Sequence, residues 1–232
     1  LKDKKKVREM LSDSILKSNS TLSKDFTLYE LSKLSQSEKT AMTEEHLISP
    51  QMINDNEGAV LVNKDKTMSI MLMEEDHIRL QIIKGGYALD EAYDLADKVD
   101  DVMEESLTYA FDEKFGYLTA CPTNAGTGMR ASVMMHLPAL VMTGNISRVL
   151  QSFSGMGIAV RGMYGEGTNA DGALYQISNS ITLGLSEQEI IEKLKVVVNK
   201  ISDMEKQARE MLMNNRKDDF TDKLMRSYGI LK

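Results

Sequence analysis

Residues 115–130 combine the side chains and backbone types that an anion site needs. The segment contains the only cysteine of the chain, Cys121, two closely spaced glycines and, at its end, Arg130. Gly126 and Gly128 leave the backbone free to approach a ligand closely, and the planar guanidinium of Arg130 suits a phosphate. The apolar run 131–140 predicts a helix, whose N-terminus would add backbone N–H groups to the site. A small buried cysteine in an ordinary strand-to-helix turn explains this segment about equally well.

Charged or nucleophilic groups recur where a predicted strand ends or a glycine-rich turn begins. The residues are Glu75 and Arg79, Cys121 and Arg130, and Arg161 and Glu166. Each pair alone is weak evidence, because acidic clusters are usually solvated turns and arginines in strands usually form ion pairs. Together they supply three guanidinium groups, two carboxylates and one thiol. The positive charges of arginines can stabilise a phosphoryl group during transfer. Two carboxylates can position a guanidinium acceptor and remove a proton from it.

Hydrophobic periodicity places these residues on strands and helices. Apolar residues at helical spacing predict one or two short helices within 26–45, helices at 89–109 and 145–153, a long helix at 186–215 and a short one at 220–228. A turn-linked hairpin is predicted at 59–73, with further strands at 78–82, 158–164 and 173–177. Arg79 would then share one face of its strand with His77 and Gln81. The predicted architecture is α+β, an antiparallel sheet with helices packed on one side.

The composition fits an acidic globular enzyme. The 232 residues are 42% hydrophobic and 27% charged, which allows a proper core. A net charge of −7 disfavours non-specific binding to nucleic acid. There is no apolar run long enough to predict a membrane span. One cysteine cannot form an internal disulfide, so we expect a cytoplasmic location.

Three motifs, in this order and spacing, resemble the catalytic domain of the ATP:guanido phosphotransferases. They are Glu74-Glu75-Asp76-His77-x-Arg79, Cys121-Pro-Thr-Asn-x-Gly-Thr-x-x-Arg130-Ala-Ser-Val and Arg161-Gly-x-x-Gly-Glu166. The resemblance extends over roughly residues 46–228. Residues 112–117, 134–138, 161–167 and 227–230 are similar to the bacterial members that phosphorylate arginine in proteins. The resemblance implies the fold of the phosphagen kinases and glutamine synthetase, an antiparallel β-sheet flanked by helices. Residues 41–232 would form the catalytic domain, with 1–40 as its helical or irregular lead-in.

The resemblance also implies a role for each candidate site residue. Glu75 and Glu166 would clamp the substrate guanidinium, with Glu75 as general base, and Cys121 would lie against it as a thiolate. The residues implied to hold the nucleotide are Arg79, Arg130 and Arg161 at the phosphates and His46 beside the adenine. The implied cofactors are ATP and Mg²⁺, with no protein site for a metal.

The implied reaction is transfer of the γ-phosphoryl group of Mg-ATP to arginine guanidinium groups of proteins, in the stress response and protein quality control. Tyr164 and Gly167 stand where kinases of small guanidines usually have Arg and His. Two alternatives stay open: a kinase of free arginine or another small guanidine, and a catalytically silent binding fragment. The second arises because the family's Ser-x-Arg-x-Arg strand has no match, and a C-terminal phosphoarginine-binding domain would begin only after Leu231.

Partners follow from the same resemblance. They are arginine-bearing protein substrates, including a basic transcriptional repressor, an activator protein, a Clp-type protease chaperone and a second copy in a homodimer. Direct binding to nucleic acid or to a membrane is not expected.

Overall fold

Two antiparallel sheets organise the structure, a computed structural model in which residues 2–162, 171–215 and 217–232 are described. The chain divides into a first unit, Leu1–Gly128, and a second unit, Met129–Lys232. Antiparallel strands with flanking helices are present in both units. Among the described residues, no helix combines the length and the apolar character needed to span a lipid bilayer.

The first unit contains a four-stranded antiparallel sheet. In spatial order its strands are β1 (Phe26–Glu30), β2 (Ala59–Asn63), β3 (Met68–Leu72) and β4 (Ile78–Ile82). The two central strands are buried along their whole length, which explains why their sequences are almost continuously apolar. The predicted hairpin at 59–73 and the predicted strand at 78–82 are confirmed.

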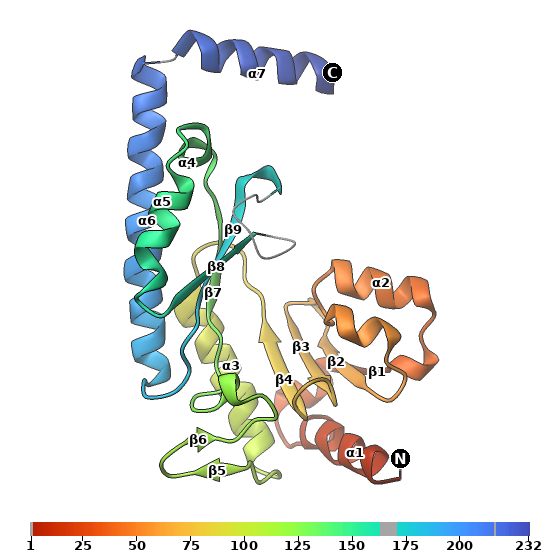
Figure 1. The fold of residues 1–232 in the computed structure, drawn as a ribbon. Coiled ribbons are helices and arrows are strands. Elements are labelled where there is room, and N and C mark those ends of the chain that lie inside the picture. Colours follow the sequence, from red (N-terminus) through yellow and green to blue (C-terminus); the bar gives the residue numbers. More distant parts are fainter. Residues whose placement is uncertain (1, 163–170, 216) are drawn as a thin grey trace. The chain divides into compact units, whose positions relative to one another are not determined.

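Helices cover both faces of this sheet. On one face, Leu61 and Ile70 pack in a core with α1 (Lys2–Leu16) and α3 (Leu89–Glu104). On the other face, Val60 and Met71 pack against residues of the 3-10 helices η2 (Leu31–Lys33) and η3 (Pro50–Asn54) and of α2 (Gln36–Glu44). Figure 1 shows α1 and α2 to either side of the strands. The prediction that helices pack on only one side is therefore wrong for this sheet.

A short hairpin follows α3 and leads to the cysteine. Its strands are β5 (Phe111–Asp112) and β6 (Gly116–Tyr117), and the chain then passes into a 3-10 turn, η4 (Pro122–Asn124). Edge-to-face contacts between the rings of Tyr109, Phe111 and Tyr117 hold the hairpin together. The Tyr109 hydroxyl donates a hydrogen bond to Asp100 of α3 at 2.9 Å, which ties the hairpin to that helix.

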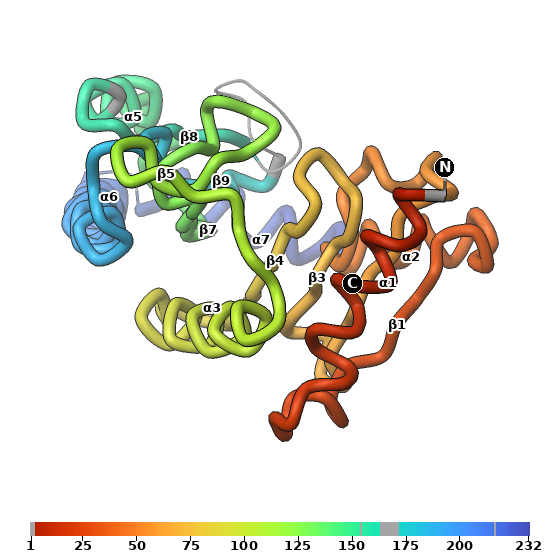
Figure 2. Tube along the Cα trace, turned by 90° about the horizontal axis from the view of Figure 1, so that it is seen from below, coloured from red at the N-terminus to blue at the C-terminus, as the bar shows by residue number. Residues whose placement is uncertain are grey.

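The second unit contains a three-stranded antiparallel sheet. Its strands are β7 (Ser132–His136), β8 (Ile158–Gly162) and β9 (Leu174–Asn179), in the spatial order β7-β9-β8, and η5 (Asp171–Ala173) precedes β9. Tyr175 and Ile177 of β9 are buried on the face that helices cover. The covering helices include α5 (Ile146–Ser154) and α6 (Glu187–Asn215), which Figure 2 shows on the same side of β8 and β9.

In the second unit, the helices predicted at 145–153, 186–215 and 220–228 are confirmed. Ser186 and Glu189 form a capping box at the start of α6. The backbone N–H of each residue donates to the side chain of the other, at 2.8 Å and 3.3 Å. A last helix, α7 (Lys217–Leu231), follows it.

The buried carboxylate of Glu205 fastens a short helix, α4 (Pro138–Met142), to α6. Its two oxygens accept hydrogen bonds from the backbone N–H groups of Ala139 and Leu140, each at 3.0 Å. Arg209 donates to the same carboxylate at 2.8 Å. A helix start leaves N–H groups without intrahelical partners, so a side chain from a distant helix takes the place of an ordinary cap.

The helix predicted over 131–140 is wrong. Residues 132–136 form β7, and a helix begins only at Pro138. The residue before a proline is disfavoured in the helical region, and Leu137 indeed has φ −122° and ψ 52°. One helix therefore cannot run through this segment, and no helix N-terminus follows Arg130 directly.

The helices predicted within 26–45 are only partly present. Phe26–Glu30 is the edge strand β1, while Gln36–Glu44 is a helix with its own Ser35–Glu38 capping box. The spacing of the leucines fits a helix, but burial along β1 alternates with a period of two. Pairing with β2 therefore overrides the helical pattern.

Candidate active site

Glu75 lies at the tip of the tight turn between β3 and β4. The Met73 N–H donates to the His77 carbonyl at 3.0 Å, which closes the turn, and Met73 adopts a positive φ of 64°. Glu75 is exposed, and its backbone N–H donates to a carboxylate oxygen of Glu74 at 2.8 Å. The turn therefore presents the Glu75 carboxylate to solvent, where it can reach a substrate.

Glu74 ties Arg79 to the same turn. Its side chain is 8% exposed and lies 3.3 Å from the Arg79 guanidinium. Burial is the largest single influence and raises the pKa of Glu74, but the hydrogen bond from the Glu75 N–H and the charge of Arg79 contribute to a net pKa below its usual range. Glu74 is thus held as a carboxylate, and Arg79 is oriented by it while half of its side chain remains exposed.

Arg79 and His46 lie on the same face of the first sheet. Arg79 stands opposite Met71, whose side chain belongs to the core that η2, α2 and η3 cover. Gln81, two residues further along β4, projects to the same face, and its amide donates to the His46 carbonyl. His46 is exposed and has a positive φ of 59°. Two residues predicted for the nucleotide are therefore brought to one surface.

Cys121 is held in a loop with internal hydrogen bonds. Its carbonyl oxygen accepts from the Thr119 hydroxyl at 2.6 Å and from the Asn124 N–H at 2.9 Å. The sulfur is half-buried and lies 3.0 Å from the Thr123 hydroxyl oxygen. Such a hydroxyl can donate to sulfur when the thiol is ionised.

The loop is closed by a bridge between Tyr117 and Gly126. The Tyr117 N–H donates to the Gly126 carbonyl at 2.8 Å, and the Gly126 N–H donates back at 3.1 Å. Gly116 has a φ of 70°, and a Cβ there would come within 2.5 Å of the Gly126 oxygen. The close approach of the two backbones therefore requires glycine at position 116.

Asp76 connects the turn of Glu75 to the loop of Cys121. One carboxylate oxygen accepts from the Ala120 N–H at 2.6 Å, and the other accepts from the Asn124 side-chain amide at 3.3 Å. The first unit therefore brings Glu75 and the predicted thiol into one hydrogen-bonded framework.

Arg130 and Arg161 share one face of the second sheet. Arg130 donates to the Ser178 hydroxyl of β9 at 3.2 Å. Arg161 stands opposite Gln176 on the same strand, and side chains two residues apart in a strand point to the same face. Both arginines are exposed. This face lies opposite the one that carries the buried Ile177, so the sheet buries its apolar side and offers two guanidinium groups on the other.

Asn179 fixes the backbone around Arg130 from both sides. Its side-chain oxygen accepts from the Ala131 N–H at 2.8 Å, and its amide donates to the Met129 carbonyl at 3.1 Å. Sequence reasoning missed this residue and Asp76, because their partners lie 44 to 50 residues away in the chain. Glu166, which the motif pairs with Arg161, lies outside the described residues, as do Tyr164 and Gly167.

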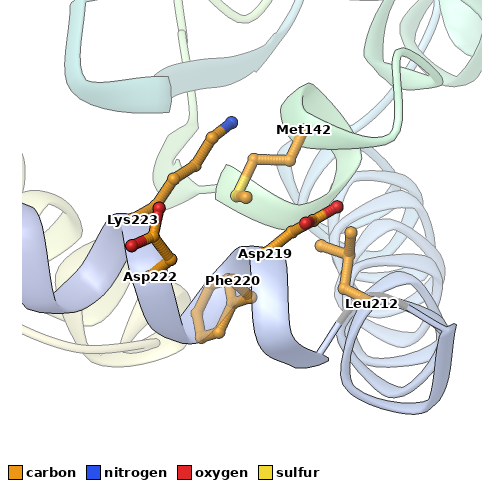
Figure 3. Close-up of a pocket in the computed structure, with 6 residues that line it drawn as sticks. All are labelled: Met142, Leu212, Asp219, Phe220, Asp222 and Lys223. Carbon is orange, nitrogen blue, oxygen red and sulfur yellow. The ribbon is translucent and has the colours of Figure 1, made fainter.

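The pocket in Figure 3 is lined by residues of α4, α6 and α7, and none of the candidate site residues is among them. Met142, Leu212 and Phe220 give it an apolar wall, and its charged lining residues are Asp219, Asp222 and Lys223. Two carboxylates against one ammonium group disfavour a polyphosphate, so the pocket does not suit a nucleotide.

Comparison with known proteins identifies the family. Residues 6–208 match the family described as ATP:guanido phosphotransferase, C-terminal catalytic domain. The chain is 53% identical over 228 residues to a protein-arginine kinase of Caldanaerobacter subterraneus subsp. tengcongensis, covering 98% of this chain and 68% of that protein. It is 52% identical over 227 residues to a protein-arginine kinase of Clostridium acetobutylicum, covering 97% of this chain and 66% of the relative.

Solved structures of two kinases have a fold similar to that of this chain. A lombricine kinase matches 94% of this chain and 62% of its own, with a TM-score of 0.78 and 26% identity. A duplicated taurocyamine kinase from Schistosoma mansoni with bound transition-state-analog components matches 89% of this chain and 30% of its own, with a TM-score of 0.78 and 25% identity.

The chain belongs to the ATP:guanido phosphotransferase family and contains its catalytic domain. The family and the α+β fold predicted from the motifs are thereby confirmed. The chain spans about two thirds of the length of the first relatives that it matches.

Proposed function

We propose that this protein transfers the γ-phosphoryl group of ATP to the guanidinium group of arginine residues in proteins. The observation that carries the proposal is the high identity to relatives named protein-arginine kinase, 53% and 52% over almost the whole chain. The geometry agrees with this chemistry, because exposed guanidinium groups and an exposed carboxylate stand where the three motifs meet the sheets.

The arginines fit the phosphates of ATP. Arg130 and Arg161 present their guanidinium groups on one polar sheet face, where each could bind phosphate oxygens through two N–H groups. Arg79 lies on an exposed edge strand beside Glu74, and the ion pair would orient it for a third contact. His46, on the same face as Arg79, is proposed to lie beside the adenine. Fixed cations of this kind stabilise the charge that develops on a transferring phosphoryl group.

Glu75, Glu166 and Cys121 are proposed to act on the guanidinium. A guanidinium nitrogen forms a bond to the γ-phosphorus while the bond from that phosphorus to the bridging oxygen of ADP breaks. The proton lost from the nitrogen passes to the Glu75 carboxylate, and phosphoarginine and ADP result. Glu166 would pair with the other edge of the guanidinium. The Cys121 thiolate would orient the guanidinium without forming a covalent intermediate.

Mg²⁺ is proposed to bind together with ATP. In the described ranges, no group of three or more His, Cys, Asp or Glu side chains is placed to hold a metal ion. Mg²⁺ commonly uses substrate phosphates and water as most of its ligands, which fits a site made of arginines. When bound, it would neutralise part of the phosphate charge.

The wider role remains part of the proposal. By resemblance we propose a cytoplasmic protein that acts in protein quality control under stress. Its partners would be arginine-bearing substrates, an activator protein, a Clp-type protease chaperone and a second copy of the chain.

A comparison of substrates tests the proposal. The protein is incubated with γ-labelled ATP and Mg²⁺ and either an arginine-rich protein or free arginine, lombricine or taurocyamine. We expect acid-labile label on the protein, located on arginine by mass spectrometry, and little ADP release with the free guanidines. Label on a free guanidine alone would indicate a small-guanidine kinase. Absence of turnover with every acceptor would favour a binding fragment, and calorimetry with Mg-ATP would then show whether the nucleotide binds.

Replacing Cys121 by alanine should lower turnover more than nucleotide affinity. Loss of the orienting sulfur should reduce kcat by about 10- to 100-fold, as small misplacements of reacting groups do. The KM for ATP should change by less than about threefold, because the arginines that bind the phosphates remain. Cys121→Ser, which can keep the contact with Thr123, is the matched control and should retain more activity. A rise in the KM for ATP with unchanged kcat would contradict the assigned role.

A further inference from the structure

The side chain of Asp76 spans the two parts of the first unit that carry proposed catalytic groups. Asp76 directly follows Glu75 in the turn between β3 and β4. Its carboxylate reaches Ala120, one residue before Cys121, at 2.6 Å, and the amide of Asn124, three residues after it, at 3.3 Å. The acidic turn is thus attached to the cysteine loop on both sides of the sulfur.

The loop between these two attachment points has little freedom of its own. The carbonyl oxygen of Cys121 accepts hydrogen bonds from Thr119 and from the Asn124 N–H, at 2.6 and 2.9 Å. A displacement of Ala120 or Asn124 would therefore carry Cys121 with it. The shorter of the two hydrogen bonds to the Asp76 carboxylate comes from the backbone N–H of Ala120. Because the acceptor is charged, this bond is stronger than one between neutral groups.

We propose that Asp76 is a positioning residue, which sets the separation between the Glu75 carboxylate and the Cys121 sulfur. The proposal rests on the proposed function, since it gives these two groups a common substrate. Glu75 moves with Asp76 because the residues are adjacent, and Cys121 moves with Asp76 through Ala120 and Asn124. Both carboxylate oxygens of Asp76 bind the loop, which places Asp76 to act through its neighbours.

A double-mutant cycle in kinase activity separates positioning from direct action. In Asp76→Ala, kcat should fall by about 10- to 100-fold while the KM for ATP changes by less than about twofold. Asn124→Ala should lower kcat less. The double variant should be no worse than Asp76→Ala within about threefold, because the two residues share one interaction. Asp65→Ala removes the same charge from the exposed turn between β2 and β3 and should leave kcat unchanged.

Alkylation of the cysteine gives a readout that needs no kinase activity. Cys121 is the only cysteine of the chain, so the rate of modification by iodoacetamide, followed by mass spectrometry, reports on this loop alone. Asp76→Ala should react about tenfold faster, because the closed loop loses both of its hydrogen bonds to the Asp76 carboxylate. Asp65→Ala should react at the rate of the unchanged protein. Circular dichroism melting would confirm that each variant is folded.

Two results would overturn the proposal. Fully additive losses of kcat in the double variant would mean that Asp76 does not act through Asn124, and an unchanged alkylation rate in Asp76→Ala would mean that it does not hold the loop. If the unchanged protein phosphorylates no acceptor, the proposed function fails, and the alkylation rates still decide whether Asp76 holds Cys121.

Discussion

Glu75→Gln is expected to lower kcat for arginine phosphorylation by about 10²- to 10⁴-fold, the range typical of losing a general base. The amide keeps the size and one oxygen of the carboxylate but cannot take the proton from the attacking nitrogen. Glu75 is exposed at the tip of its turn, and its backbone contact with Glu74 does not involve its own side chain. The substitution should therefore change the free energy of unfolding by less than about 0.5 kcal/mol.

The measurement is a single-turnover assay with labelled ATP and an arginine-rich protein. Single turnover isolates the chemical step from product release. Glu105→Gln provides the matched control, because Glu105 is an exposed carboxylate at the end of α3. A Glu75→Gln protein that retains more than about a tenth of the rate would assign the proton to another group, since general-base catalysis contributes at least about 10²-fold.

Glu205→Ala should have the largest effect on stability, lowering the free energy of unfolding by about 2–5 kcal/mol. The substitution leaves the buried N–H groups of Ala139 and Leu140 without their acceptor. It also removes the partner of Arg209. Since α4 directly follows β7, we expect the loss to loosen the strand that begins beside Arg130.

Urea denaturation followed by far-UV circular dichroism would measure this loss. Glu205→Gln, which keeps one acceptor oxygen, should be intermediate. The matched control is Glu210→Ala, an exposed carboxylate on the same helix, which should shift the free energy by less than about 0.5 kcal/mol. Equal midpoints for Glu205→Ala and Glu210→Ala would show that the cap contributes nothing.

Local patterns predicted those parts of the fold that local interactions determine. The hairpin β2–β3, the strand β4 and the helices α3, α5 and α6 have the periodicity and the turn or capping residues that their structures require. The apolar residues of 131–140 fit a helix by themselves, but Pro138 keeps Leu137 out of the helical region and divides the segment into a strand and a helix. For β1 the deciding interaction is pairing with β2, some 33 residues later, which no short window contains.

The sequence predicts the candidate site as a set of motifs, but it does not predict how the folded chain positions their side chains. The order and spacing of the motifs predict Glu75, Arg79, Cys121 and Arg130 as candidate site residues and predict the family, which the comparisons confirm. The residues that hold them in place did not stand out, because Asp76 resembles a solvated turn residue and Asn179 resembles the end of a strand. Their roles depend on three backbone groups and one side-chain amide that only the folded chain brings within 3.3 Å.

The strand order β7-β9-β8 has a consequence for the route by which the second unit forms. The strand β7, which begins beside Arg130, and the strand β8, which carries Arg161, do not pair with each other. Each pairs with β9, which follows both of them in the sequence. During synthesis, β7 and β8 must wait for Leu174–Asn179 to leave the ribosome, and their open edges are exposed meanwhile. The meander β1–β4 needs no such insertion. Arg130 and Arg161 should therefore reach their final positions late and together, in one step that a defect in β9 would block for both.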